Sequence, residues 1–394
     1  MAKVRRTDYA FLYLEDPLDV AALFRGELRT RTTRPRILAL AVLTGERHEL
    51  SREELDVLLA VPAERWVDGD RRDSDTLSDL AHKGLVLSDD KDPRLSALRE
   101  RDAALSANEW NLYAALYHYM TRWSAVDFRD GGEEELQLGP ESKAAAQAFT
   151  ARHGPPPGPF PDRRQGRSLP LPDGLREGAL YRTLQARRTT RAFDAEAPMT
   201  ADELGTVLRY VFGCHGYART LADVVCIKRT SPSGGGLHPI EVYPIVSNVT
   251  GIDSGIYHYQ AYDHSLVQLA ELEPGESRRA ATAFMCGQSY FGAAGVSFVL
   301  TARFYRNHWK YRRHQKAYAG LLMDAAHLSQ TLYLVSADLD LGAFVTIAIN
   351  ARDIEERLGL DGTSEGVIAM TGCGRRTAGD SPLELAFSQQ LPLD

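Results

Sequence analysis

The chain has 394 residues, which is too long for one ordinary hydrophobic core and indicates two or three domains. Hydrophobic residues make up 44% and charged residues 25%, as in globular proteins, and no stretch reaches the roughly 20 apolar residues of a membrane helix. The formal net charge of −7 gives no indication of bulk nucleic-acid binding, and the chain lacks the apolar core of a secretory signal near its start, so we expect a cytoplasmic protein.

The spacing of cysteines and histidines argues against a metal site. The cysteines include no short-spaced pair, which excludes a zinc ribbon and argues against a disulfide framework. No two histidines have the His-Glu-x-x-His spacing or a similar ligand pattern. We therefore expect no metal.

The N-terminal residues predict a small module of strands and helices. Residues 1–14 alternate between two faces as a strand does. The apolar run at residues 37–43 predicts a short helix that ends at Gly45. Ser51 and Glu54 form a capping-box pattern, so a second helix is expected to begin there.

A further helix and a strand complete this module. A helix is expected over residues 75–82, with Gly84 as its left-handed C-cap, and a short strand over residues 85–87. Three helices followed by a strand are typical of a winged helix, so residues 1–105 are interpreted as a winged-helix-like α/β module. DNA binding is the weaker interpretation, because several aspartates lie on the last helix. A peptide-binding or shielding module is favoured instead.

Residues 106–170 are expected to join two domains. An aromatic-rich stretch at residues 110–123 has the spacing of a helix with one buried face. Further along, the run His-Gly-Pro-Pro-Pro-Gly-Pro-Phe-Pro at residues 153–161 can form neither a helix nor a strand, which is typical of a linker. The main boundary is placed here, and residues 171–394 form a separate domain.

This C-terminal domain alternates helices with a few strands, several of which look antiparallel. Such an order predicts a three-layer α+β domain. Helices are expected directly before Arg187 and over residues 201–211, 276–286 and 317–336, and strands over residues 241–247, 255–259, 296–302 and 366–370.

Four separated segments of this domain carry residues suited to a ligand. The first, Arg187-Arg-Thr-Thr-Arg-Ala-Phe193, offers three guanidinium groups to an anion such as phosphate, although a solvated basic helix end has the same composition. The second, Thr230-Ser-Pro-Ser-Gly-Gly-Gly-Leu-His-Pro239, lets backbone amides approach a planar or anionic ligand closely. A flexible surface loop is the alternative, against which the flanking prolines argue.

The other two segments lie near the C-terminus. Asp340-Leu-Gly-Ala-Phe-Val-Thr346 follows a long apolar helix, where backbone amides could face a ring. Gly372-Cys-Gly-Arg-Arg376 comes at the end of the last expected strand, and glycines followed by arginines again suit a phosphate.

Together, in this order, the four segments resemble the nitroreductase-like flavoenzymes. The resemblance is closest to the SagB-type peptide dehydrogenases, which include the azoline oxidases of thiazole/oxazole-modified peptide biosynthesis. The residues that carry it are Pro232-Ser-Gly-Gly-Gly-Leu-His-Pro239 and Gly255-Ile-Tyr-His-Tyr259. The match extends over roughly residues 175–380 and implies a nitroreductase-like fold for the C-terminal domain.

The resemblance further implies FMN as the cofactor. It assigns the first segment to the FMN phosphate and ribityl chain, the second to the isoalloxazine ring, the third to the N5 and O4 edge of the flavin, and the fourth to the phosphate again. The second segment is usually offered by the other subunit of a homodimer. The residues implied to bind FMN are Arg187, Arg188, Thr189, Arg191, Pro232, Ser233, Gly234, Gly342, Ala343, Gly374 and Arg375.

A Lys-Tyr pair is the candidate catalytic group. Lys310 and Tyr311 lie in a basic, helix-like run at residues 303–316, where azoline oxidases carry a catalytic Lys-Tyr dyad. Aromatising an azoline requires loss of a proton from carbon, and a lysine whose pKa is lowered by nearby arginines, or the tyrosine beside it, could take that proton. Alternatively, the run is a basic face that contacts a partner, a phosphate or FMN itself.

The resemblance as a whole implies an FMN-dependent oxidoreductase that matures a ribosomally made peptide by oxidising azoline rings to azoles. Its expected partners are a precursor peptide, a cyclising enzyme and a second copy of the chain, with neither nucleic acid nor membrane involved. One alternative is an NAD(P)H-dependent flavin reductase of nitro, quinone or dehydroamino-acid substrates. Another is a non-catalytic flavin- and peptide-binding component or regulator.

Overall fold

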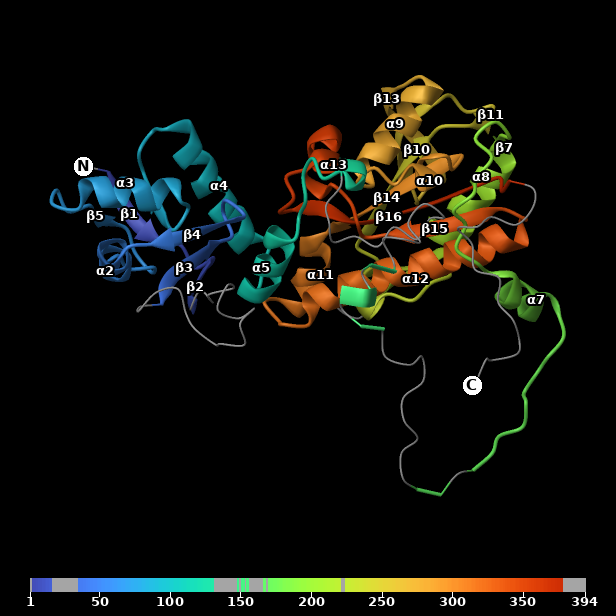
Figure 1. The fold of residues 1–394 in the computed structure, drawn as a ribbon, viewed down its shortest axis with the longest axis horizontal. Helices are drawn as coiled ribbons and strands as arrows, with labels where there is room; N and C mark the ends of the chain where they lie inside the picture. Colours follow the sequence, from blue (N-terminus) through green and yellow to red (C-terminus); the bar gives the residue numbers. More distant parts are fainter. Residues whose placement is uncertain are drawn as a thin grey trace. The chain divides into compact units, whose positions relative to one another are not determined.

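Figure 1 shows the computed structural model, which describes residues 2–15, 35–130, 147–148, 150–152, 154–155, 166–167, 169–220 and 224–377. The chain divides into two compact units. The N-terminal part of the chain shares its unit with two short segments from the C-terminal half. The first unit consists of Met1–Trp123, Ala302–Leu321 and Glu355–Gly366, and the second of Ser124–Thr301, Leu322–Ile354 and Val367–Asp394.

Among its described residues, the N-terminal part of the first unit contains two small sheets and four helices. One sheet has the strand order β5-β1-β6 and the other β2-β3-β4, and their paired strands are antiparallel. The elements are β1 (Lys3–Arg6), β2 (Ala10–Glu15), β3 (Arg36–Ala41), β4 (Glu46–Leu50), α2 (Arg52–Ala60), β5 (Val67–Asp68), α3 (Ser74–His82), β6 (Val86–Ser88), α4 (Pro93–Ala107) and α5 (Leu112–Met120).

The prediction of a helix at residues 37–43 is wrong, because these residues lie mostly in strand β3. This strand pairs with β2 on one side and with β4 on the other, so its backbone groups are satisfied by a sheet. A short apolar run fits a buried strand as well as a helix by periodicity, and here the neighbouring strands decide. Residues 1–14 likewise form two strands in different sheets, β1 and β2, rather than one.

The predictions for the next two helices are confirmed. The Ser51 hydroxyl accepts the backbone N–H of Glu54 at 3.1 Å, and the Glu54 carboxylate accepts the N–H of Ser51 at 2.7 Å, so the capping box opens α2. Gly84 follows α3 with φ +72°, a conformation that favours glycine. Leu77 and Leu80 of α3 face the core as expected.

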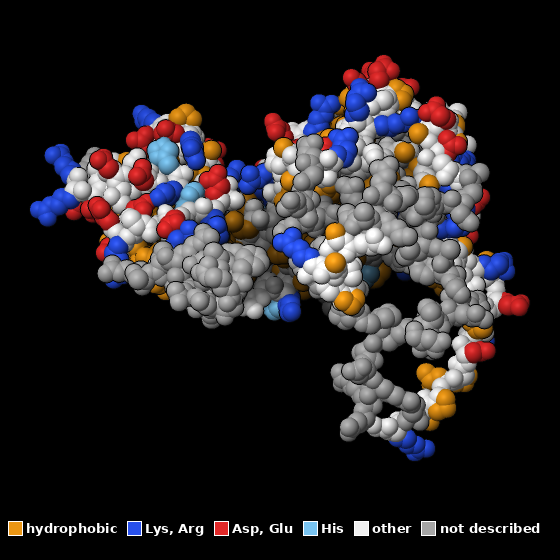
Figure 2. Space-filling model, in the orientation of Figure 1, with side chains coloured by type: hydrophobic (Ala, Val, Ile, Leu, Met, Phe, Trp, Pro, Cys, Tyr) orange, Lys and Arg blue, Asp and Glu red, His pale blue; other side chains and the backbone are white. Residues whose placement is uncertain are grey.

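The core of this part lies between the strands and helices α2 and α3. Its buried members are Val4, Ala39, Ala41, Leu50, Val57, Leu58, Val61, Leu77, Leu80, Leu85 and Val86. Figure 2 shows acidic and basic side chains interspersed on the visible face of this part of the first unit. The winged-helix interpretation stays a prediction, although its first predicted helix is a strand.

Helix α5 is attached to the rest of the first unit by Trp110, which directly precedes it. Trp110 is 1% exposed, its indole N–H donates to the carbonyl oxygen of Thr363 at 2.9 Å, and its ring centre lies 4.5 Å from that of Phe304. The helix predicted at residues 110–123 therefore exists over Leu112–Met120, but its buried face is different. His118 and Tyr119 are buried, whereas Tyr113 and Tyr117 of the predicted face are exposed.

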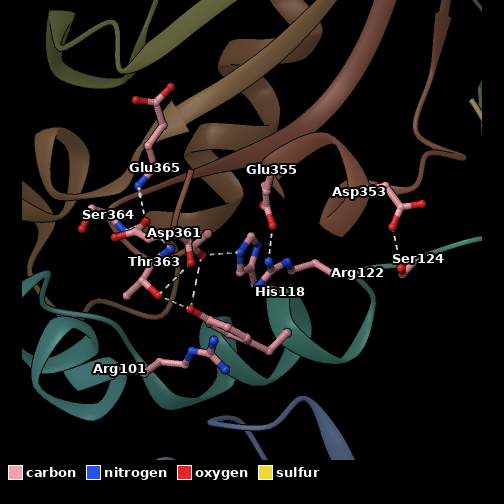
Figure 3. Close-up of polar contacts among 12 residues, drawn as sticks. Arg101, His118, Arg122, Ser124, Asp353, Glu355, Asp361, Thr363, Ser364 and Glu365 are labelled. Atoms are coloured by element: carbon pink, nitrogen blue, oxygen red, sulfur yellow. Dashed lines mark hydrogen bonds and ion pairs between the residues drawn. The ribbon is translucent and has the colours of Figure 1, made fainter. Parts of the chain in front are cut away.

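A buried polar network connects α5 with the segment at residues 355–366, as Figure 3 shows. Arg122 forms an ion pair with Glu355, whose side chain is 3% exposed. His118 donates from Nε2 to the carbonyl oxygen of Gly362 at 3.0 Å, and Tyr119 contacts the Thr363 hydroxyl. The N-terminal helices and this C-terminal segment are thus packed as one unit.

The second unit is built on a sheet of six strands with the order β13-β12-β10-β14-β16-β15. The pairs β10–β12, β12–β13 and β15–β16 are antiparallel. The strands of the residues after Trp123 are β7 (Met199–Thr200), β8 (Gly216–Arg219), β9 (Val225–Lys228), β10 (Ile240–Val246), β11 (Val249–Thr250), β12 (Gly255–Gln260), β13 (Ser265–Glu271), β14 (Val296–Arg303), β15 (Gly342–Thr346) and β16 (Glu365–Gly374).

Helices accompany this sheet, and α9 packs on β10 and β12. In Figure 1, α9 lies above strands β10, β14 and β16, and α12 lies below them. The helices after Trp123 are η1 (Phe128–Asp130), α7 (Ala179–Ala186), α8 (Ala201–Val207), η3 (Leu208–Phe212), η4 (Gly234–Gly236), α9 (Pro274–Phe284), α10 (Ser289–Gly292), α11 (Phe304–Tyr311), α12 (Ala317–Asp338) and α13 (Ala351–Leu358).

The helices and strands predicted for the C-terminal domain are all present within a few residues, and the α+β class is confirmed. Strands β13 and β15 and helix α13 were not predicted. Most of the predicted linker, at residue 153 and residues 156–165, lies outside the described residues. Within the described part of the chain, no helix has the length and hydropathy needed to cross a membrane.

Candidate functional site

The first, third and fourth predicted segments meet at one edge of the large sheet. The backbone N–H of Thr190 donates to the carbonyl oxygen of Ala343 at 2.9 Å, and that of Asp194 donates to Arg375 at 2.9 Å. Because β15 and β16 pair antiparallel, Gly342 lies opposite Gly374. Segments that are far apart in the sequence are therefore held together by backbone hydrogen bonds.

A pocket of about 130 Å³ lies among these segments. Arg188 and Arg376 give it positive charge, and the carboxylate of Asp340 accepts a hydrogen bond from Arg376 at 3.2 Å. Two guanidinium groups against one carboxylate favour an anionic ligand. The lining residues are Ala186, Arg188, Tyr333, Ala337, Asp340, Leu341, Ala343 and Arg376.

Gly342 allows the side chains of Thr190 and Arg376 to pack directly against its backbone, beside this pocket. A Cβ atom at position 342 would lie 2.6 Å from Cγ2 of Thr190 and 2.8 Å from Cγ of Arg376. Thr190 is fully buried, and its hydroxyl has no hydrogen-bond partner among the described residues. An unsatisfied buried hydroxyl costs free energy, so a bound ligand with a polar atom would stabilise this arrangement.

Arg187 and Thr189 contact Tyr333 of helix α12. The Arg187 guanidinium lies 5.5 Å from the centre of the Tyr333 ring, a cation–π distance. The hydroxyls of Thr189 and Tyr333 are 3.1 Å apart. Arg191 of the same segment is half-buried. The segment after α7 is thereby fixed on α12, which also lines the pocket.

Arg375 and Arg376 have different environments. Arg375 makes two hydrogen bonds of 2.8 Å with the Glu203 carboxylate and donates to the carbonyl oxygen of Pro198 at 3.3 Å. Burial alone would raise the pKa of Glu203, but the backbone N–H of Thr200 and the charge of Arg375 lower it. Arg376, which was not predicted as a site residue, lines the pocket instead.

Cys373 lies between the two site glycines of the last strand. It is completely buried, and desolvation raises the pKa of its thiol to about 12. The thiol is thus held in its neutral, unreactive form. Cys373 therefore serves as a small apolar residue of the core rather than as a nucleophile.

The second predicted segment binds to another part of α12 and does not line the pocket. The Ser233 hydroxyl donates to Asp324, and the backbone N–H of Gly234 donates to the same carboxylate at 3.1 Å. Pro232 lies between Ser233 and Ser231, and the Ser231 hydroxyl donates to the carbonyl oxygen of His327 at 3.3 Å. Asp324 and Tyr333 are nine residues apart, which is about 14 Å along a helix.

Lys310 and Tyr311 form the end of helix α11 in the first unit, whereas the pocket belongs to the second unit. The Lys310 side chain is exposed, and its amine lies 5.6 Å from the centre of the Tyr311 ring. Their catalytic role stays a prediction.

Of the lining residues, only Arg188 and Ala343 were predicted; among the six others, three are polar, namely Tyr333, Asp340 and Arg376. Tyr333 lies within an apolar helix, where a tyrosine is expected to pack in the hydrophobic core. Asp340 and Arg376 lie within the third and fourth predicted segments. However, nothing in the neighbouring sequence distinguishes the role of Arg376 from that of Arg375 or indicates that Asp340 pairs with Arg376. Asp340 has φ +53°, which places it in the sparsely populated left-handed region.

Comparisons with known proteins identify relatives of this chain. Residues 184–375 match the model of the Nitroreductase family. A nitroreductase homologue from Methanocaldococcus jannaschii is 28% identical over 190 residues, which covers 48% of this chain and 88% of that protein. The trifolitoxin-processing protein TfxB of Rhizobium leguminosarum bv. trifolii is 29% identical over 138 residues.

The match to the trifolitoxin-processing protein is partial on both sides, at 34% of this chain and 36% of that protein. Among solved structures, a chain of the E. coli microcin synthetase McbBCD complex with truncated pro-MccB17 bound aligns with a TM-score of 0.40 and 18% identity. That alignment covers 62% of this chain and 100% of the other.

The matched residues 184–375 contain β15, β16 and the segment after α7, and thus the whole pocket apart from Arg376, which follows directly. Residues 184–375 are therefore a nitroreductase-family domain, the domain of an oxidoreductase.

Proposed function

We propose that this chain is an FMN-dependent dehydrogenase that oxidises azoline rings of a ribosomally made peptide to azoles. The observation that carries the proposal is the pocket at the edge of the large sheet, where three of the four predicted FMN segments meet around Arg188 and Arg376. The similarity to a trifolitoxin-processing protein supports a role in maturing a natural product.

The residues around the pocket fit an anionic, polar cofactor such as FMN. Arg188 and Arg376 would hold the phosphate, and the buried Thr190 hydroxyl lacks the partner that a ligand oxygen would provide. The absence of a Cβ atom at Gly342 lets Thr190 and Arg376 keep these positions. At about 130 Å³ the pocket suits the phosphate-bearing arm of FMN rather than the whole molecule.

The predicted second segment would serve the flavin of a second copy. Ser233 and Gly234 are fixed on Asp324 of α12, away from the residues that line the pocket of the same chain. A homodimer in which each subunit offers this loop to the other would use both sets of residues. Such a dimer is part of the proposal.

The chemistry divides between the cofactor and this chain. An azoline becomes an azole when it loses a proton from carbon and a hydride from the neighbouring atom, and bound FMN supplies the hydride acceptor. Lys310, or Tyr311 beside it, would take the proton. Dioxygen would accept the two electrons in the end, and a cyclising enzyme would have to form the azoline beforehand from a precursor peptide.

The proposal is tested with the purified full chain. It should be yellow and release FMN on denaturation, and it should remove two hydrogens from a synthetic peptide that carries one thiazoline ring, as followed by mass spectrometry. Lys310→Ala and Tyr311→Phe should retain FMN and lose this activity. A colourless protein that binds no added FMN, or full activity in both variants, would contradict the proposal.

An NAD(P)H-dependent reductase is the second candidate, because the nitroreductase homologue from M. jannaschii matches over 88% of its length. In that case NADPH should bleach the bound flavin rapidly, and a nitroaromatic compound should restore its colour, while the thiazoline peptide remains unchanged. The two activities can be measured on the same preparation.

A further inference from the structure

The end of helix α11, which carries Lys310 and Tyr311, has an unusual backbone. The helix covers Phe304–Tyr311, and the next residue, Arg312, has φ +48° and ψ −144°. Residues other than glycine rarely adopt this region, and doing so costs about 1–3 kcal/mol. Such a conformation persists only where surrounding contacts impose it.

Local hydrogen bonds account for part of these contacts. The backbone N–H of Arg312 donates to the carbonyl oxygen of His308 at 2.6 Å, and that of His314 donates to Tyr311 at 3.0 Å. These bonds close the last turn of α11. They do not fix the direction in which the chain leaves the helix, because they involve only its own residues.

A segment from the N-terminal part of the chain supplies the remaining contacts. The two carboxylate oxygens of Glu109 lie 3.4 Å from Arg312 and 3.2 Å from Arg313. The Asn111 side-chain amide donates to the carbonyl oxygen of Arg313 at 2.9 Å. The His308 ring contacts the carbonyl oxygen of Asn108 at 3.0 Å. Residues 108–111 thus hold the end of α11 at several points, and we call them the 108–111 clamp.

The 108–111 clamp is itself rigidly held. It connects α4 to α5, and Trp110 in its middle is buried against Phe304 and His308 of α11, with ring centres 4.5 Å and 5.1 Å away. Asn111 caps α5, because its side-chain oxygen accepts the backbone N–H of Tyr113 at 3.0 Å. Burial on one side and a helix cap on the other leave Glu109 little freedom.

The ion pairs of the 108–111 clamp are too exposed to contribute much to the free energy of unfolding. The side chains of Arg312 and Arg313 are 60% and 53% exposed, and that of Glu109 is 30% exposed. Exposed pairs of this kind contribute about 0–1 kcal/mol, because water screens them. Because both arginines directly follow Lys310 and Tyr311, the ion pairs instead restrict the position of the end of α11.

We propose that Glu109 and Asn111 are positioning residues, which hold the end of α11 so that Lys310 and Tyr311 keep one orientation. This proposal rests on the proposed function, in which these two residues take the proton. It gives the N-terminal part of the chain a role in the reaction itself, in addition to any role in binding a peptide.

Two substitutions test the clamp with little damage to the fold. Glu109→Gln removes the charge that faces both arginines, and Asn111→Asp removes the donor to Arg313 while keeping an oxygen that caps α5. Glu49→Gln is the matched control, because Glu49 makes a similar exposed pair with Arg36 at 3.3 Å.

The expected result is a change in local order and in kcat, with thermal stability almost unchanged. Trypsin cleavage after Lys310, Arg312 and Arg313 should become several-fold faster in both clamp variants of the FMN-loaded chain. With the thiazoline peptide, kcat should fall about tenfold or more, since small misplacements of a catalytic group are costly, while KM stays near that of the wild type. The control should behave as the wild type.

Comparison of the clamp variants with Lys310→Ala distinguishes the possible failures. Wild-type kcat and cleavage in both clamp variants, with Lys310→Ala inactive, would overturn the clamp and leave the proposed function standing. Full activity of Lys310→Ala and Tyr311→Phe would overturn both.

Discussion

The backbone N–H of Thr190 donates a 2.9 Å hydrogen bond to the carbonyl oxygen of Ala343, and this bond joins the arginine-rich segment after α7 to strand β15. Both residues are buried, so the bond is shielded from water. It leaves the Thr190 hydroxyl beside Gly342, without a partner among the described residues. The packing around Thr190 and Gly342 therefore limits which ligands can bind next to them.

Gly342→Ala is expected to impair FMN binding. The added methyl group would lie within 2.8 Å of atoms of both Thr190 and Arg376, and neither can move without disturbing the pocket. Overpacking of this kind also lowers the free energy of unfolding by about 1–3 kcal/mol. Quenching of FMN fluorescence and thermal unfolding measure the two effects.

Gly320→Ala is the matched control for this change. Among the described residues, no atom outside the local backbone of helix α12 lies within 4 Å of a Cβ at position 320. Alanine in a helix is favoured over glycine by up to about 1 kcal/mol, so this variant should be as stable as the wild type or more so. Normal FMN affinity in Gly342→Ala would show that its methyl group is tolerated.

Arg375 and Arg376 are expected to have different roles, Arg375 in stability and Arg376 in ligand binding. Arg376→Ala is expected to weaken FMN binding about tenfold or more, because a hydrogen bond to a charged group contributes about 1.5–3 kcal/mol. Arg375→Ala should chiefly lower stability, since Glu203 loses its bidentate partner. Titration with FMN and urea unfolding of both variants measure this. A larger loss of affinity in Arg375→Ala would favour the prediction made from the sequence.

The positions of the site segments could be predicted because they carry local chemistry. Glycines and arginines in short runs mark places where a backbone comes close to an anion, and these runs also carried the family resemblance. Tyr333 could not be found in this way, because its role depends on which face of α12 turns toward the segment after α7. The same holds for Glu109 and Arg312, which are far apart in the sequence and meet only in the folded chain.

The fold was predictable where periodicity and capping agree. The capping box at Ser51 and the long apolar helix α12 were both found. Strand β3 was mistaken for a helix, because the short apolar run at residues 37–43 has no polar positions that would reveal a helix or strand period. The pairing of β3 with β2 and β4 is not local and could not be seen in the sequence. Strand β15 was missed for the same reason, since it is short and pairs only with β16.

The ion pair between Arg122 and Glu355 is expected to matter for the stability of the first unit (Figure 3). Their side chains are 13% and 3% exposed, so removal of one partner leaves the other charge buried without this ion pair. Glu355→Gln or Arg122→Met alone should each cost about 3–5 kcal/mol of unfolding free energy in urea. Because the double variant leaves no unpaired charge, it should lose clearly less than the sum.

The pair Arg36–Glu49 is the control for this cycle, because its side chains are 35% and 57% exposed. Because Arg36 also pairs with Glu15, Glu49 is the partner to substitute, and Glu49→Gln should change stability by about 0–1 kcal/mol. Strict additivity of the two changes at Arg122 and Glu355 would show that the residues are not coupled.

His118 should make the first unit less stable in acid. Desolvation by burial lowers its pKa to about 3 in the folded chain, with a further contribution from the charge of Arg122, whereas the unfolded value is near 6.5. Between these values the unfolded chain binds a proton that the folded chain does not, so stability rises with pH. The contribution of His118 is complete above about pH 6.5 and is lost progressively as the pH falls toward about 3.

His118→Gln tests this dependence, because glutamine can still donate to the carbonyl oxygen of Gly362 and does not titrate. The variant is expected to be less stable than the wild type at pH 7, since its side chain fits the aromatic cluster around Trp110 less well. Its stability should fall less steeply between about pH 6.5 and 4, as measured by urea unfolding across that range. Parallel pH profiles for the two proteins would mean that His118 is not the group whose protonation opposes folding.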